Sequence, residues 1–177
     1  METKLLYCLL IIADQSHKRY SMKLQNIQIL VIRLALAGLF FHLGIGKISD
    51  GWLTSPAGLL DDLQGYQKHA TGIHLQYLSD VAIPYVNIWS KLITIGETLV
   101  GISMLLGLFV RLSSLAGILM VLNLHAATGN LYSLNFFGSA WAALIIASFI
   151  ATGLAGAGRW MGFDQLLARS NANSILW

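Results

Sequence analysis

Four long apolar runs divide the chain, and polar residues gather between them. The runs occupy residues 29–48, 88–110, 112–128 and 136–156. About 20 apolar residues are enough for one helix to cross a bilayer. Backbone polar groups cannot stay unbonded in lipid, so each run is predicted to form a helix. The pattern therefore predicts an all-α protein, an integral membrane four-helix bundle surrounded by the lipid bilayer.

The connections between the runs differ greatly in length. Only Arg111 separates the second run from the third, which predicts a tight antiparallel hairpin. Residues 49–87, between the first and second runs, form a much longer segment. This segment holds apolar residues at helical spacing, namely Leu59, Leu60, Leu63 and Tyr66. The spacing predicts one or two amphipathic helices at the membrane interface, with an ordinary polar loop as the alternative.

The composition supports a membrane protein. Hydrophobic residues make up 56% of the chain and charged residues only 11%. A soluble domain carries about 25% charged residues, so this chain cannot cover a soluble surface with charge. The basic residues are scattered, which argues against a nucleic-acid interface. The single cysteine, Cys8, excludes an internal disulfide, a CxxC pair and a cysteine-based metal cluster.

The first 21 residues differ from the rest of the chain. Their apolar stretch, residues 5–13, is too short to span a bilayer, and no small-x-small cleavage site follows it. The sequence that begins at Met22 is more typical of the start of a protein. Residues 1–21 are therefore interpreted either as an extension that precedes the native start or as a short interfacial helix. The membrane domain then covers residues 22–170, followed by a tail at 171–177.

The distribution of lysine and arginine predicts the orientation. With the N-terminus inside, the cytoplasmic set is Lys4, Lys18, Arg19, Lys23, Arg33, Arg111, Arg159 and Arg169. The outer set is Lys47, Lys68 and Lys91. Eight against three predicts an inner-membrane protein with both termini inside. A start at Met22 removes three of the eight and leaves five against three, the same direction.

Glu97 lies inside the second run, where a charge is costly unless it is paired or protonated. A rise of about 1.5 Å per residue places Glu97 and His42 each about 18 Å above the cytoplasmic edge. The same count places His125 about 20 Å above it. Trp141, on the fourth run, falls near this level. Equal depth predicts a buried polar cluster of His42, Glu97 and His125.

Two interpretations of this cluster stay open. In the first, the three residues are catalytic: they bind a quinone head group and relay a proton, while Asn123 and Trp141 help to hold the quinone. In the second, Glu97 only hydrogen-bonds a histidine and stabilises helix packing by about 1 kcal/mol. No spacing typical of metal ligands occurs, so no metal is expected.

Lys47 and Lys91 lie at the outer ends of the first and second predicted helices. One interpretation is that they form an electropositive mouth that binds an anionic substrate. The other is that their long side chains extend to the lipid head groups.

Three stretches resemble a known family. They are RLALAGLFFHLGIGKI, GETLVGISMLLGLFVRLSSLAG and LAGAGRWMGFDQLLA. Together they resemble the DoxX superfamily of small four-helix membrane proteins over about residues 25 to 170. The long segment after the first helix is similar to the DoxD-like branch, the small subunit of thiosulfate:quinone oxidoreductase. The second stretch is the most specific, with a glutamate, spaced glycines and an arginine at the turn: Glu97, Gly101, Gly107 and Arg111.

The resemblance implies a quinone-interacting subunit of a membrane oxidoreductase. The thiosulfate:quinone enzyme oxidises thiosulfate to tetrathionate and passes the electrons to a membrane quinone. It is a two-subunit system, so the resemblance implies a second oxidoreductase subunit as partner. The chain has no redox-active cysteine pair, and it is not expected to catalyse the reaction alone. The alternative is a non-catalytic membrane anchor or scaffold for a redox-stress complex. Whether the chain also forms a homo-oligomer stays open.

Overall fold

The computed structural model describes residues 2–132 and 140–170, and this part of the chain is helical without strands. The helices, in chain order, are α1 (Glu2–Ser49), α2 (Ala57–Gln67), α3 (Gly72–Tyr77), the short π-helix η1 (Leu78–Ala82), α4 (Val86–Leu106), α5 (Val110–Ala127), α6 (Ala140–Ala155) and α7 (Asp164–Ser170). The predicted all-α fold class is confirmed.

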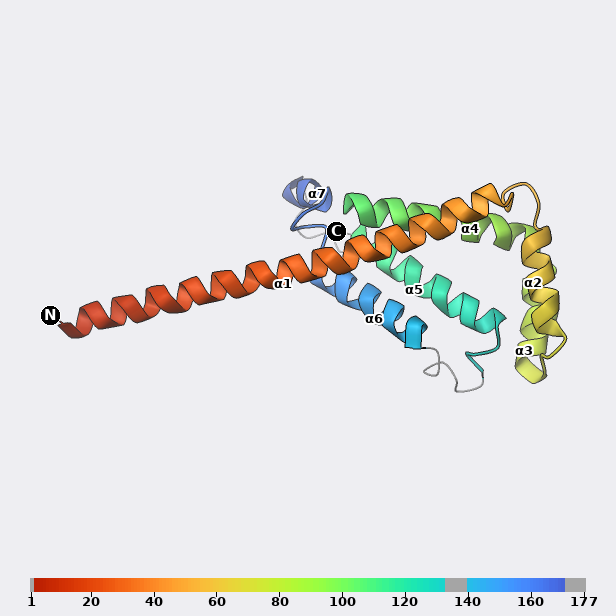
Figure 1. Cartoon of the computed structure of the whole chain (residues 1–177), viewed down its shortest axis with the longest axis horizontal. Helices are drawn as coiled ribbons and strands as arrows, with labels where there is room; N and C mark the ends of the chain where they lie inside the picture. Colours follow the sequence, from red (N-terminus) through yellow and green to blue (C-terminus); the bar gives the residue numbers. More distant parts are fainter. Residues whose placement is uncertain (1, 133–139, 171–177) are drawn as a thin grey trace.

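Three of these helices are long and apolar enough to cross a membrane. Their spanning parts are Leu24–Ser49, Val86–Leu106 and Val110–Ala127. The fourth apolar helix, α6, has only 16 residues. The predicted fourth helix began at residue 136, and its first residues lie outside the described part of the chain. Helix α1 is longer than the predicted first helix, because it continues without a break from Glu2 (Figure 1).

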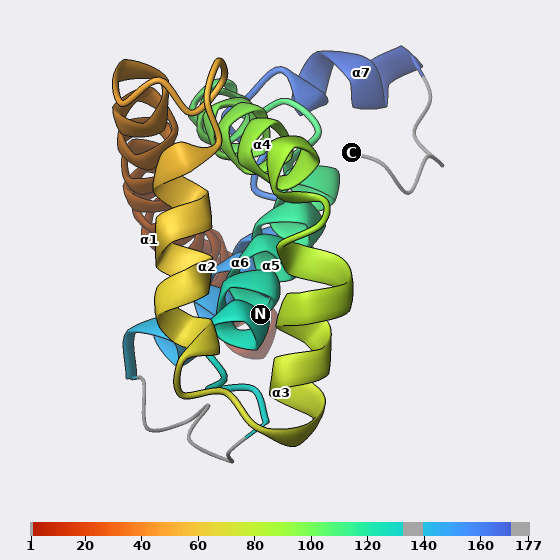
Figure 2. The same cartoon turned by 90° about the vertical axis from the view of Figure 1, so that its right-hand side faces the viewer.

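The four apolar helices form a bundle of two pairs. Helix α1 packs most extensively on α4, and α5 packs most extensively on α6. The contacts of α1 with α6, and of α4 with α5, close the ring. Helices α1 and α5 therefore lie diagonally opposite each other across the bundle (Figure 2). The N-terminal part of α1 extends well beyond the other helices (Figure 1).

Small residues let the paired helices approach closely. A side chain at Gly44 would collide with Thr98 of α4, and one at Gly101 would collide with the backbone of Phe41. Between the pairs, the rings of Phe40 and Phe149 meet edge to face, with centroids 5.0 Å apart. These contacts fix the rotation of α1 against its neighbours, and so they decide which α1 residues face inward.

One end of the bundle is closed by the tight hairpin between α4 and α5. Gly107 ends α4 in the left-handed conformation (φ 66°), which glycine adopts without strain. Asp164 of α7 then accepts hydrogen bonds from the backbone N–H groups of Phe109 (2.7 Å) and Val110 (3.1 Å). A carboxylate is favourable at this position because the first N–H groups of a helix lack partners in the helix.

Arg33 is buried at the same end. Its guanidinium donates to the carbonyl oxygens of Ala157 (2.8 Å) and Met161 (2.7 Å). The distribution of lysine and arginine predicts that this residue lies at the cytoplasmic edge. In the structure, its two hydrogen bonds connect α1 to the segment between α6 and α7.

The opposite end of the bundle is covered by residues 57–82, here called the roof. Helices α2, α3 and η1 run across the ends of the bundle helices rather than along them (Figures 1 and 2). Leu59, Leu63 and Leu78 of the roof are buried in one apolar cluster with Ala127 of α5. The predicted helices in residues 49–87 are thus present, and their apolar face packs on the bundle.

Candidate functional site

A cavity of about 500 Å³ lies beneath the roof, between the two helix pairs. All four bundle helices, the α1–α2 connection and the roof contribute to its walls. Apolar and aromatic side chains dominate the lining, including Leu43, Trp52, Leu59, Trp89, Leu92, Leu119, Met120 and Trp141. Cavities of this size and character are typical of sites for small organic molecules.

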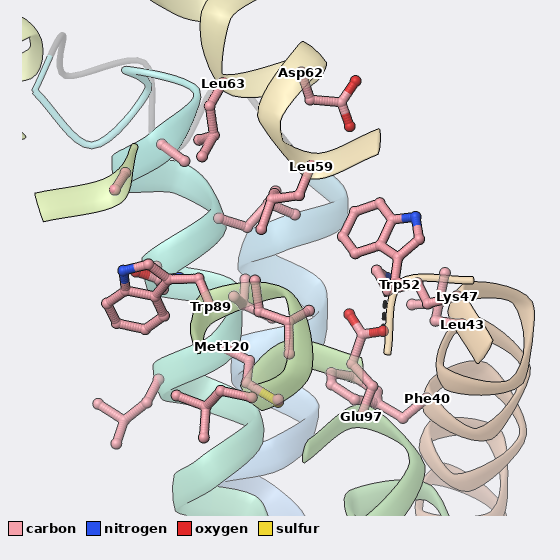
Figure 3. Close-up of a pocket in the computed structure, with 18 of the residues that line it drawn as sticks. Phe40, Leu43, Lys47, Trp52, Leu59, Asp62, Leu63, Trp89, Glu97 and Met120 are labelled. Carbon is pink, nitrogen blue, oxygen red and sulfur yellow. Dashed lines mark hydrogen bonds and ion pairs between the residues drawn. The ribbon is translucent and has the colours of Figure 1, made fainter. Parts of the chain in front are cut away.

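Lys47 and Glu97 form an ion pair inside this cavity. The Lys47 Nζ donates to the Glu97 Oε2 over 2.6 Å, and the two side chains are only 19% and 13% exposed (Figure 3). The same ammonium lies 5.4 Å from the centre of the Trp52 ring, within the range of a cation–π contact. The pair offers a potential ligand a strong donor and a strong acceptor side by side.

Glu97 therefore has a partner that depth counting did not assign to it. His42 is exposed and does not line the cavity. His42 and Lys47 are five positions apart in α1, so their side chains differ by about 140° in direction around the helix axis. The predicted cluster of three residues is wrong at His42, because equal depth does not specify which face of a helix a residue occupies.

His125 is buried, as predicted, but its surroundings differ from those expected. Its ring packs edge to face on the Trp141 ring, with centroids 5.4 Å apart. Trp141 lines the cavity, whereas His125 is not part of the lining. His125 thus supports a wall of the site from behind.

Asn123 lines the cavity, on the α5 side. Its Oδ1 accepts a hydrogen bond of 2.7 Å from the hydroxyl of Tyr77, which lies on α3. Asn123 and Trp141, the predicted quinone-binding residues, both line the cavity. Tyr77 also lines it but could not be predicted, because residue spacing does not specify the path of the roof over the bundle. The aromatic residues of the 49–87 segment were the available signal.

Lys91 lies apart from this site. It is exposed on α4 and does not belong to the cavity lining. The proposed electropositive mouth is therefore not formed by Lys47 and Lys91 together. Lys47 points inward and is neutralised by Glu97.

Three or more histidine, cysteine or carboxylate side chains that gather closely enough to hold a metal ion were not found among the described residues. The site presents one ion pair, one amide–phenol pair, the exposed Asp62 carboxylate and a mainly apolar and aromatic lining. This arrangement can orient an apolar ring that carries hydrogen-bonding groups, and it can exchange a proton with it.

The ion pair and Asn123 lie on α1, α4 and α5, and the chain was compared with known protein families. The DoxX family model matches residues 28–129. The chain belongs to the DoxX family. The match spans Lys47, Glu97 and Asn123, so most of the cavity lies within the part shared with the family. The comparison with curated proteins found no match, and neither did the comparison with solved structures.

Family membership agrees with the three helices that are long enough to span a membrane. This DoxX protein is accordingly an integral membrane protein.

Proposed function

We propose that this DoxX protein is a quinone-interacting subunit of a membrane oxidoreductase, of the DoxD-like, thiosulfate:quinone type. The observation that carries the proposal is the Lys47–Glu97 ion pair in the wall of a mainly apolar and aromatic cavity of about 500 Å³. The residues fit a quinone head group, because such a ring is flat and apolar and has hydrogen-bond acceptors at its edge.

Each residue of the ion pair has a definable task. The Lys47 ammonium is positioned to donate a hydrogen bond to a carbonyl oxygen of the ring. The Glu97 carboxylate is positioned to take up or release a proton beside it. A bound quinone supplies the capacity to accept two electrons and two protons. Trp52 and Trp89 provide flat apolar surfaces against which a ring can pack (Figure 3).

The electrons are proposed to come from a second oxidoreductase subunit that oxidises thiosulfate. In that reaction two thiosulfate ions give one tetrathionate ion and two electrons, the number that one quinone accepts. The single cysteine of this chain supports the assignment of thiosulfate oxidation to the other subunit, because one cysteine cannot form a redox-active dithiol within the chain. The chain is proposed to lie in the inner membrane with both termini inside, which is supported by the excess of lysine and arginine on that side.

The direct test is whether quinone co-purifies with the protein. The wild-type chain and the Lys47→Met variant are purified in mild detergent without added quinone, and the extracted quinone is quantified per protein. Lys91→Met is the matched control, since it removes a lysine that is exposed and outside the cavity. We expect a stoichiometric fraction of quinone with the wild type and the control, and at least about a tenfold loss with Lys47→Met.

Equal, trace amounts of quinone in all three preparations would overturn the proposal. That result would favour the other function, an anchor or scaffold for a redox-stress complex, since such a role needs no ligand in the cavity.

A further inference from the structure

The cavity has polar groups on opposite sides. Lys47 belongs to α1, and Asn123 belongs to α5. These two helices lie diagonally opposite each other in the bundle. Figure 3 shows Lys47 on α1, with Trp52 of the α1–α2 connection beside it, across the cavity from α5. A ligand that fills the space between them is therefore approached by a polar side chain from each side.

The Tyr77–Asn123 pair lies at the cavity wall, since both residues belong to the lining. The Tyr77 hydroxyl donates to the Asn123 Oδ1, so the amide oxygen is occupied. An asparagine amide also has an NH₂ group with two donors. Among residues 2–132 and 140–170, no acceptor is recorded for this NH₂ group, and Asn123 is part of the cavity lining.

Tyr77 fixes the orientation of that amide. Burial raises the pKa of the Tyr77 phenol above its ordinary value, with a smaller contribution in the same direction from Tyr132. The phenol therefore keeps its proton and stays a donor at neutral pH. A permanent donor at the amide oxygen keeps the NH₂ group turned the other way. Another contact holds α3 in place, a hydrogen bond of 2.9 Å between His74 Nε2 and the Ala127 oxygen of α5.

We propose that Asn123, oriented by Tyr77, is the second anchor of the ligand and binds the ring carbonyl opposite the one that faces Lys47. The site then takes para-quinones, whose two carbonyl oxygens lie on opposite sides of one flat ring, in preference to apolar rings with a single acceptor. This inference rests on the proposed function, since it specifies how the same cavity holds its quinone. Tyr77 acts as a positioning residue, because its hydroxyl is bound to Asn123.

The test is isotope-edited infrared spectroscopy of bound quinone. A short-tailed benzoquinone carrying ¹³C at one or the other ring carbonyl is bound to the wild-type protein, to Asn123→Leu and to the control Asn87→Leu. Asn87 is exposed on α4 and outside the cavity. A carbonyl that accepts a hydrogen bond absorbs at lower frequency than the same carbonyl in lipid, so the two labels report on the two anchors separately.

We expect both carbonyl bands to be shifted in the wild type and in Asn87→Leu. In Asn123→Leu one band returns to its frequency in lipid, the other stays shifted, and the Kd rises about two- to tenfold. Tyr77→Phe should broaden the Asn123-dependent band, because the amide is no longer held in one orientation, whereas Tyr85→Phe, at an exposed tyrosine, should not.

Outcomes that overturn this inference differ from those that overturn the proposed function. Bound quinone with only one shifted carbonyl in the wild type, or two shifted bands in Asn123→Leu, would refute the second anchor and leave the proposed function standing. A role of Asn123 in fastening the roof alone would lower the Tm in Asn123→Leu and move neither band. No bound quinone in the wild type would refute both.

Discussion

Lys47 and Glu97 are joined across α1 and α4 by an ion pair, with 2.6 Å between Nζ and Oε2. The two residues are 50 positions apart in the chain and belong to antiparallel neighbours. Each side chain would be costly alone in a mainly apolar enclosure. Together they cancel their net charge while keeping a strong donor and a strong acceptor at the cavity wall.

The coupling between these residues can be measured as a double-mutant cycle. Lys47→Met and Glu97→Gln should each lower the free energy of unfolding by about 3 kcal/mol, because each leaves a charged or polar partner unmatched. The double variant should lose clearly less than the sum. Unfolding by sodium dodecyl sulfate in mixed micelles, followed by circular dichroism, gives the four values. Strictly additive losses would show that the ion pair does not contribute to the folded state.

The two histidines that depth counting grouped with Glu97 should behave differently from each other. His125→Ala removes a buried ring that packs on Trp141, and it should cost about 2–3 kcal/mol of unfolding free energy. His42→Ala changes an exposed side chain and should cost less than about 0.5 kcal/mol. The same denaturation assay compares them. A large loss with His42→Ala would contradict the rotation of α1 described above.

Close helix packing predicts opposite effects of one substitution at two glycines. A Cβ at Gly117 would collide with the ring of Phe149, whereas a Cβ at Gly38 would meet nothing within 4 Å. Gly117→Ala should therefore lower stability by about 1–3 kcal/mol through overpacking. Gly38→Ala should be neutral or stabilising by up to about 1 kcal/mol, since alanine favours helix. Similar Tm changes for both variants would contradict the α5–α6 packing.

A substitution at the hairpin end of the bundle should lower stability without changing quinone binding in the cavity. Arg33→Met leaves the carbonyl oxygens of Ala157 and Met161 without their donor, so the Tm and the yield of folded protein should fall. Quinone bound per folded protein should be unchanged, because Arg33 is not part of the cavity lining. Size-exclusion chromatography followed by quinone extraction measures both quantities. A loss of quinone in the folded fraction would indicate that the two ends are coupled.

The helices and the hairpin could be predicted from the sequence because lipid allows few alternatives to helix and the apolar runs are long. The partner of Glu97 could not be predicted in the same way. Counting rise along the helices gives depth, but the rotation of α1 depends on contacts such as those of Gly44 with Thr98. The sequence predicts Lys47 at the outer end of the first helix, and in the structure its long side chain forms a hydrogen bond with Glu97.

The position of Tyr77 and of the roof could not be predicted from the sequence either. Helical spacing in residues 49–87 predicted that helices form, and it identified the apolar face that includes Leu59 and Leu63. It did not predict where that face would pack. The position of Tyr77 over Asn123 follows from how α3 crosses the end of α5, which is a tertiary relationship without a local sequence pattern.

Photolabelling with an azido-quinone in native membranes tests the central claim most directly, because it locates the ligand without assuming an activity. We expect adducts, mapped by mass spectrometry, on cavity-lining residues such as Lys47, Trp52 and Asn123, and we expect excess unlabelled quinone to suppress them. Adducts confined to exposed apolar residues such as Leu144 and Leu154, with no protection by unlabelled quinone, would contradict a quinone site in this cavity.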